Sequence, residues 1–547
     1  MKRAIVVSGV FGLAALIAAY VALAPHASSA APGAARSALA VLDAAAAQLI
    51  AVQGRSAAVL AVLAMGAVLA LLAAIGVGAG GGAGAEPPPP SSRRESAEPR
   101  EREQAAEPEP DLREQRLANL RRRAAAEGGG IWRPMEPPPR PVVLVRAVRE
   151  RGHSWFGARS WLGGVPRLGD APWPRDAAGT PLPFAAQIDL AELGVACPES
   201  PLPREGALAF FLGTGAVVAV PPGDHQFSDP PPDLPPAFDE GGYPFPARAN
   251  RLSRLLFPFW PVELAALDLP EHLRDHRDAK GDEAAERAIE EAMADLLSQH
   301  VPPRSSAFAA DGSVLWWHGV RHMADRLHVA LESSGRLVAL REDGLRRAEA
   351  ALAALEADAA EEDRLEAARR DVAEQQTALA ALQAQREGLP GMVAAIDGFV
   401  ADREPWAPLS AEEHAVVRDF LAELRAGYGD LVRHHAPHDL AELATLSLRA
   451  MVTGTPDALA AMPDAELARI NRECRLPTMH QHQMFGLGGR QQSARDDHRG
   501  DLLLLQLGYD DMMEWRWGDM GLFQFWISPR ALAAGEWDAA ELTFECG

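Results

Sequence analysis

The chain begins with two long, uncharged and apolar stretches. The first runs from Ala4 to Ala24 and the second from Ala57 to Gly78. Each has about the 20 residues that an α-helix needs to cross the hydrocarbon core of a bilayer. We therefore predict a membrane anchor in residues 1–83, built from two transmembrane helices at about 4–24 and 57–78. A cleaved signal peptide is the alternative for the first stretch, because basic residues precede it and the small residues 27–30 follow it.

The arginine and lysine positions predict how such an anchor is oriented. Lys2 and Arg3 precede the first stretch, four arginines follow the second within residues 93–102, and only Arg36 and Arg55 lie between the two. Positive residues concentrate on the cytoplasmic side of a membrane. We therefore expect the inner (plasma) membrane as the location, the lipid bilayer as a partner, and a cytoplasmic C-terminal part.

The pattern changes three times after the apolar stretches. Residues 84–130 are rich in Pro, Glu and Arg with few apolar positions, which predicts a disordered linker. Residues 131–260 alternate short apolar runs with Pro and Gly clusters, which is typical of strands and turns. Residues 261–473 carry alanine, leucine and charged residues at helical period and predict a helical insertion, after which residues 474–547 return to the strand pattern.

One part of the helical insertion has the pattern of a coiled coil. No Gly or Pro interrupts residues 345–387, and two heptad frames of leucine and valine are offset by one residue at the acidic cluster 361–363. This offset predicts an antiparallel hairpin with its tip at the cluster and arms of about 20 residues; a single long helix is the alternative. Such an arm would bind a protein partner or a second copy of the chain, or it would be a spacer whose apolar seam closes on itself.

A set of residues occurs twice in the same order, once on each side of the helical insertion. Leu162-Gly163-Gly164 precedes an apolar run that contains Gln187, and Leu487-Gly488-Gly489 precedes one that contains Gln506; an aromatic strand follows in both. Apolar residues alternate in these strands, as one buried face of a sheet requires. We therefore predict an α+β fold with antiparallel sheets and an internal duplication. A buried amide is costly unless it is hydrogen-bonded, so we expect both glutamines to have structural roles; the alternative is binding residues that face a shared cleft.

At these residues the chain resembles the YwqG-like family of uncharacterised bacterial proteins. The resemblance rests on Trp161 to Pro166, Pro172-Trp173-Pro174 and Gln187 to Leu190 in a first block at about 160–220, and on Leu503 to Gln506 and Trp517 to Trp526 in a last block at about 480–546. It implies an α+β fold built on antiparallel sheet with an internal duplication. It implies no established activity, and the helical middle has no counterpart in it.

Charge and cysteine content narrow the range of partners. The chain has 75 acidic and 53 basic residues, a formal charge of −22, which would repel a phosphate backbone, so we expect no nucleic acid partner. Its three cysteines stand far apart without a CxxC pair, which supports neither a disulfide framework nor a zinc ribbon. We predict no cofactor.

Candidate chemistry is concentrated near the C-terminus. His480 and His482 would lie on one face of an extended segment, where Asp496, Asp497 or Asp519 would complete a divalent metal site or join them in acid-base chemistry. Trp517 and Asp519 would line a groove for a peptide or ligand, or Trp517 would seal the edge of the core. The histidines at 434, 435 and 438 have no HExxH glutamate and read as a solvated helix end.

No sequence motif in the chain specifies a reaction. It has no phosphate-binding GxxxxGK[ST] loop and no GxSxG elbow, so enzymatic activity is not expected. The leading hypothesis is a membrane-tethered cytoplasmic binding or interaction module. The alternative is a metal-dependent or acid-base hydrolase with its site between the duplicated halves, and an immunity-like role ranks last.

Overall fold

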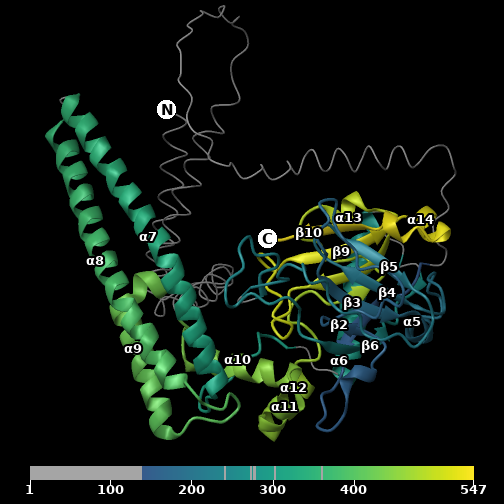
Figure 1. Ribbon diagram of the computed structural model, residues 1–547. Helices are drawn as coiled ribbons and strands as arrows, with labels where there is room; N and C mark the ends of the chain where they lie inside the picture. The colour runs from purple at the N-terminus through teal and green to yellow at the C-terminus, as the bar shows by residue number, and fades with distance from the viewer. Residues whose placement is uncertain (1–137, 240–241, 272–273, 275–278, 301–303, 359–360) are drawn as a thin grey trace, which may run out of the picture. The chain divides into compact units, whose positions relative to one another are not determined.

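The computed structural model describes residues 138–547, apart from 240–241, 272–273, 275–278, 301–303 and 359–360. This part of the chain forms one ten-stranded antiparallel sheet and a group of helices (Figure 1). The fold is therefore α+β, with a single continuous sheet in place of the separate sheets that the sequence pattern predicted.

The sheet has the strand order β10-β9-β8-β7-β1-β6-β2-β3-β4-β5. The strands are β1 (Val142–Arg146), β2 (Trp161–Leu162), β3 (Phe184–Asp189), β4 (Ala207–Phe211), β5 (Ala216–Val220), β6 (Trp260–Ala266), β7 (Gln483–Met484), β8 (Leu502–Gly508), β9 (Leu522–Ile527) and β10 (Glu541–Glu545). The order is symmetric about the central β1–β6 pair, because β2 to β5 follow β6 outward on one side and β7 to β10 follow β1 on the other.

The strand register shows that the two halves are equivalent. Gln187 of β3 lies opposite Trp161 and Ala209, and Gln506 of β8 lies opposite Gln483 and Gln524. The β3–β4 and β8–β9 pairs also share a β-bulge, which lies between Phe184 and Ala186 in β3 and between Leu503 and Leu505 in β8. In both strands the glutamine is the residue that directly follows the bulge. Bulges are kept in place within related structures, so a bulge at the same position in both hairpins indicates that one hairpin is present twice. The predicted internal duplication is therefore found in the strands.

The turn that precedes the repeated hairpin is aligned differently from the prediction. Gly163 and Gly164 follow β2 with φ of 61° and 64°, and the residues that follow β7 with the same backbone are Phe485 and Gly486, with φ of 61° and 74°. The N–H of Gly163 donates to the Ala185 carbonyl of β3, and the N–H of Phe485 donates to the Leu503 carbonyl of β8. Gly488 and Gly489 are therefore three residues beyond the equivalent turn, although their sequence is the same as that of Gly163 and Gly164.

Alternation along the strands divides the side chains between two faces. Phe210 of β4 and Phe525 of β9 contact each other edge to face at 5.1 Å, so the halves share one core on this face. Ala209 and Phe211 point to the opposite face, where a second cluster forms around Trp161 and Phe184. Gln187 and Gln506 lie on the face opposite to that of Phe210 and Phe525, one in each half of the sheet.

The longer helices follow β6 and end before β7. They are α6 (Ala279–His300), α7 (Trp317–Ala357), α8 (Glu362–Val400), α9 (Ala411–Val432), α10 (Leu440–Thr453), α11 (Pro456–Ala461) and α12 (Asp464–Glu473). Short elements connect the strands: η1 (Trp155–Gly157), α5 (Leu190–Ala196), α13 (Ala494–Asp497), α14 (Pro529–Ala534) and η4 (Trp537–Ala539).

Helices α7 and α8 form an antiparallel hairpin (Figure 1). Its tip lies between Ala357 and Glu362, next to the predicted acidic cluster, and the single long helix is excluded. The arms have 41 and 39 residues, about twice the predicted length, because α7 begins at Trp317 and α8 continues through Pro390. Leu365 and Leu382 are buried against α7, so the apolar seam closes within the hairpin, as the spacer interpretation requires.

The predicted membrane anchor requires correction. Its segments at 4–24 and 57–78 lie outside the described residues, as does the predicted linker at 84–130. Within the part of the chain that the structure describes, no helix combines the length and apolar character needed to cross a membrane. We therefore withdraw the transmembrane helices, the bilayer as a partner and the placement at the inner membrane.

Burial of His318 at the start of α7 is expected to make the stability of the folded chain depend on pH. Its ring stacks on Trp406 at 4.8 Å, and burial lowers its pKa from 6.5 to about 3. Between pH 6.5 and 3, His318 is therefore protonated in the unfolded chain and neutral in the folded chain. Stability from this group is complete above pH 6.5 and is lost as the pH falls, at up to about 1.4 kcal/mol per pH unit. In urea titrations between pH 7 and 4, His318→Phe should flatten this slope, whereas His153→Phe at an exposed position should not; equal slopes in the two variants would contradict the assignment.

Candidate functional site

The two predicted glutamines hold loops against their own strands. The Gln187 carbonyl oxygen accepts from the N–H of Arg167 at 2.8 Å, and its amide nitrogen donates to the carbonyl of the same residue at 3.3 Å. The Gln506 carbonyl oxygen accepts from the N–H of Gly489 at 2.5 Å, and its amide nitrogen donates to the Gln481 carbonyl at 2.8 Å. Since β2, β6, β1 and β7 lie between β3 and β8, the structure does not bring the two amides together.

The predicted metal residues have separate partners. His482 is fully buried, where its Nε2 donates to Asp510 at 2.9 Å and its Nδ1 accepts from the N–H of Gly508 at 3.1 Å. His480 accepts from the side-chain amide of Gln491 at 2.9 Å. No group of three His, Cys, Asp or Glu residues able to hold a metal ion occurs in the described part of the chain. The structure thus gives His480 and His482 no third ligand there.

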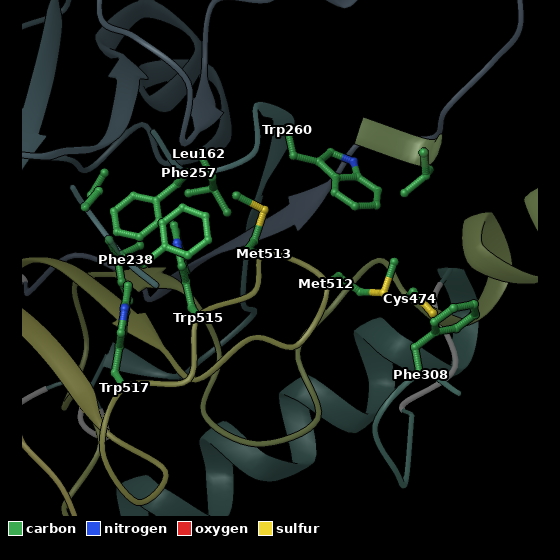
Figure 2. Close-up of a cluster of buried hydrophobic side chains, with 14 of the residues drawn as sticks. Leu162, Phe238, Phe257, Trp260, Phe308, Cys474, Met512, Met513, Trp515 and Trp517 are labelled. Carbon is green, nitrogen blue, oxygen red and sulfur yellow. The ribbon is translucent and has the colours of Figure 1, made fainter. Parts of the chain in front are cut away.

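Trp517 and Asp519 also occupy different environments. Trp517 is fully buried and stacks on Trp515 with ring centroids 4.6 Å apart. Figure 2 shows these two rings next to Phe257 and Phe238 in the core. Asp519 is exposed. Trp517 therefore seals the core instead of lining a groove.

A buried network of charges lies beside this aromatic cluster. Asp510 pairs with Arg146, whose Nε also donates to the Cys474 carbonyl at 2.8 Å. The next residue, Asp511, pairs with Arg304 and, at 3.3 Å, with Arg449, and it accepts from the N–H of Phe308 at 2.7 Å. The two carboxylates therefore fix the end of β8 to β1, to the segment before α7 and to α10.

A cavity of about 440 Å³ opens next to Arg449. Its walls come from the loop between β5 and β6, the segment before α7, helices α7 and α10, and the segment between β8 and β9. Four arginines from these elements line it: Arg254, Arg326, Arg449 and Arg516. The volume lies within the usual range for small-molecule sites.

Two of these arginines are matched by acids in the wall. Arg326 pairs with Glu442 at 2.6 Å and Arg254 with Glu514 at 3.3 Å. The Arg516 side chain, by contrast, makes no ion pair with any residue in the described part of the chain. Within the described residues, the Arg516 guanidinium therefore has no ion-pair partner, although the carboxylates of Asp239 and Asp439 also line the cavity.

Arg449 adds a second cation beside Arg516. Its Nη2 is used by Asp511 and by the Phe308 carbonyl, while its buried Nε has no hydrogen-bond partner among the described residues. Burial lowers the pKa of Arg449; Asp511 opposes this shift, and the neighbouring Arg516 adds to it. Two neighbouring guanidinium groups repel each other, and an anionic ligand beside Arg516 would offset this repulsion.

Local sequence explains how these two arginines are positioned. Arg449 lies on α10, whose N-cap Asp439 accepts from the N–H of Glu442 at 2.9 Å and whose apolar side is buried through Leu443, Leu448, Met451 and Val452. Arg516 stands between two fully buried tryptophans. In an extended segment the middle residue points away from its neighbours, so burial of Trp515 and Trp517 directs Arg516 outward.

Comparison with known families gives a match in two segments. Residues 160–226 and 433–546 match the model of a domain of unknown function (DUF1963). Arg449 and Arg516 lie within the match, and so do residues 433–473, which the sequence pattern had assigned to the helical insertion. No curated protein shows significant similarity to the chain. The match supports the presence of a domain of this uncharacterised family, carried in two segments of the chain.

Proposed function

We propose that the protein is a YwqG-like binding module that takes an anionic small molecule in the arginine-lined cavity. The observation that carries the proposal is the Arg516 guanidinium, which lines the cavity beside the buried cation of Arg449 and forms no ion pair with the described residues. The YwqG-like assignment is supported by the two sequence blocks, the repeated hairpin and the two-segment family match.

The chemistry of the cavity favours a carboxylate or phosphate ligand. A guanidinium presents planar N–H donors that match both groups, and such charge-assisted bonds are about twice as strong as neutral ones. Phe308 and Leu252 contribute apolar wall, so the cavity also accepts a short hydrocarbon part. The alternative of a hydrolase at His480, His482 and Asp519 is not favoured by the geometry, because His482 is fully buried on Asp510 while Asp519 is exposed.

Ligand-induced stabilisation tests this proposal directly. Inorganic phosphate and citrate, compared with chloride at equal ionic strength, should raise the melting temperature of the full chain with saturation, because a ligand that binds only the folded state stabilises it. Arg516→Gln removes the unpaired cation without breaking an ion pair, and we expect it to weaken anion binding about 10- to 100-fold.

Arg418→Gln is the matched control for Arg516→Gln. Arg418 is exposed on α9, forms an ion pair with the neighbouring Asp419 at 3.0 Å and does not line the cavity, so its loss should leave anion binding unchanged. Equal weakening in both variants would mean that the anions act on the general surface charge. Unchanged binding in Arg516→Gln, or no saturable stabilisation by either anion, would contradict the proposed site.

A further inference from the structure

The hairpin of α7 and α8 has two parts that are packed differently. Near the start of α7, helix α9 lies against both α7 and α8 and completes a three-helix bundle, which we call the base (Figure 1). Beyond the end of α9, the two helices continue as an arm that consists of residues 336–357 and 362–384. The base buries apolar side chains from all three helices: Val320, Met323 and Leu327, then Leu389, Val393 and Ile396, then Val417, Leu421 and Leu424. In the described part of the arm, only Val338, Leu365 and Leu382 are buried.

In α7 the base meets the arm at the sequence Ser333-Ser334-Gly335. The Ser333 hydroxyl donates to the Ala330 carbonyl at 3.0 Å, and the Ser334 hydroxyl donates to the Leu331 carbonyl at 2.6 Å. Serine hydroxyls that bond to carbonyls of the preceding turn compete with the hydrogen bonds of the helix itself, and adjacent Ser and Gly residues are a common site of helix bending. This turn is therefore a weak point of α7.

Helix α8 is weakened at the same level. Gly335 of α7 faces Arg386 of α8, because a Cβ on Gly335 would lie 3.5 Å from the Arg386 Nη2. Four residues further on, Pro390 has no N–H to donate to the Arg386 carbonyl, and glycines at 388 and 391 stand on either side of it. Although α8 remains helical here, it has one main-chain hydrogen bond fewer and two residues of low helix propensity.

Helix α9 is broken at this level. Tyr428 has φ of −132° and ψ of 18°, outside the helical range, and it stands between two glycines. A Cβ on Gly388 would lie 2.6 Å from the Tyr428 hydroxyl, so the break in α9 lies against the weakened turn of α8. Beyond the break, the Asp430 carboxylate accepts from the side-chain amide of Gln385 at 3.3 Å. The last residues of α9 are therefore bonded to α8 where the arm begins.

We propose that the arm pivots on the base at this level, with Gly335, Pro390 and Tyr428 as the hinge positions of the three helices. These weak points are distant in sequence, yet the contacts of Gly335 and Gly388 place them side by side where the third helix ends. Hinges consist of a few residues that absorb changes of backbone angle between two packed bodies. The pivot lies beyond Arg326, the last residue of α7 that lines the arginine cavity, so this proposal does not depend on the anion site.

Distances between pairs of spin labels in the full chain test the pivot. Labels at Glu349→Cys on the arm and Glu412→Cys on α9 lie on opposite sides of the hinge, and labels at Ala353→Cys and Gln383→Cys lie on the arm alone; all four positions are exposed. Cys546→Ser is the background, because the other two cysteines are buried. Pulsed dipolar EPR should give a distance distribution about two-fold wider, or more, for the pair across the hinge, because motion at the hinge adds to the spread of the labels.

A stiffened variant assigns the motion to these residues. It combines Gly335→Ala, Pro390→Ala and Gly391→Ala, which place the best helix former at three hinge positions, and both glycines have room for a Cβ. We expect it to narrow the distribution across the hinge to the width of the arm pair. Gly398→Ala, which adds a Cβ to α8 within the base where nothing lies within 4 Å, should leave the width unchanged.

Two kinds of result would overturn the proposal. Equal widths for the two label pairs in the parent chain would show that the arm and the base move as one body or that the arm bends along its whole length. A wide distribution across the hinge that the stiffened variant does not narrow, or that Gly398→Ala narrows equally, would place the motion elsewhere.

Discussion

Replacing Asp510 with alanine is expected to lower the free energy of unfolding by about 3–5 kcal/mol, the cost of leaving a buried charge unpaired. Asp510 and Arg146 are both fully buried. Burial alone would raise the pKa of Asp510, but Arg146, His482 and Arg304 hold it well below its usual range, so the carboxylate is ionised in the folded protein. Without it, Arg146 keeps its hydrogen bond to the Cys474 carbonyl and its contact with the Trp260 ring, and His482 loses the acceptor of its Nε2 proton.

Urea unfolding at pH 7 measures this loss as a shift of the transition midpoint. Asp419→Ala is the control, because Asp419 forms an exposed ion pair on α9 and such pairs contribute about 0–1 kcal/mol. A loss below about 1 kcal/mol for Asp510→Ala would show that water or local rearrangement solvates Arg146, and the network would then not be the anchor between β8 and β1.

The hairpin of α7 and α8 shows what heptad patterns reveal. The one-residue offset between two leucine frames located the tip correctly, because each arm needs its own apolar seam to face the other. The lengths of the two arms could not be predicted from the heptad pattern. The first turns of α7 are buried by tertiary contacts at Val320, Met323 and Leu327, and burial of Leu389 and Val393 on one face keeps α8 helical through Pro390.

The duplicated sheet shows a different limit. Alternation of apolar residues identified the repeated strands, because it reflects burial directly. The turn was misaligned because Gly488 and Gly489 match Gly163 and Gly164 in composition, whereas the equivalent backbone is adopted by Phe485 and Gly486. A phenylalanine in the left-handed region has no recognisable sequence signal.

The arginine cavity was beyond sequence reasoning for a third reason. Its arginines come from positions 254, 326, 449 and 516, which only the tertiary fold brings together. One local signal existed, since Trp515-Arg516-Trp517 places a charge between two residues that favour the core. The histidines at 480 and 482 suggested a metal site because they are close in sequence, but in the structure they form hydrogen bonds with Gln491 and Asp510, respectively.

Replacing Gly163 with alanine is expected to cost about 3 kcal/mol or more, from overpacking and backbone strain together. Gly163 has φ of 61°, and a Cβ there would overlap the carbonyl group of Pro258 in the segment leading to β6. The left-handed backbone alone does not forbid a side chain, because Phe485 adopts the same φ at the equivalent turn of the second half. The close approach of Pro258 is therefore the feature that requires glycine.

Gly179→Ala separates these two costs. Gly179 has φ of 86°, but a Cβ there would meet nothing within 4 Å, so its replacement should cost only the left-handed strain of about 1–2 kcal/mol. Urea unfolding of the two variants side by side should show the larger loss for Gly163→Ala. Equal losses would mean that backbone conformation alone selects glycine at both turns, and the tight packing of β2 against the 257–259 segment would then lose its role in holding the first half of the sheet.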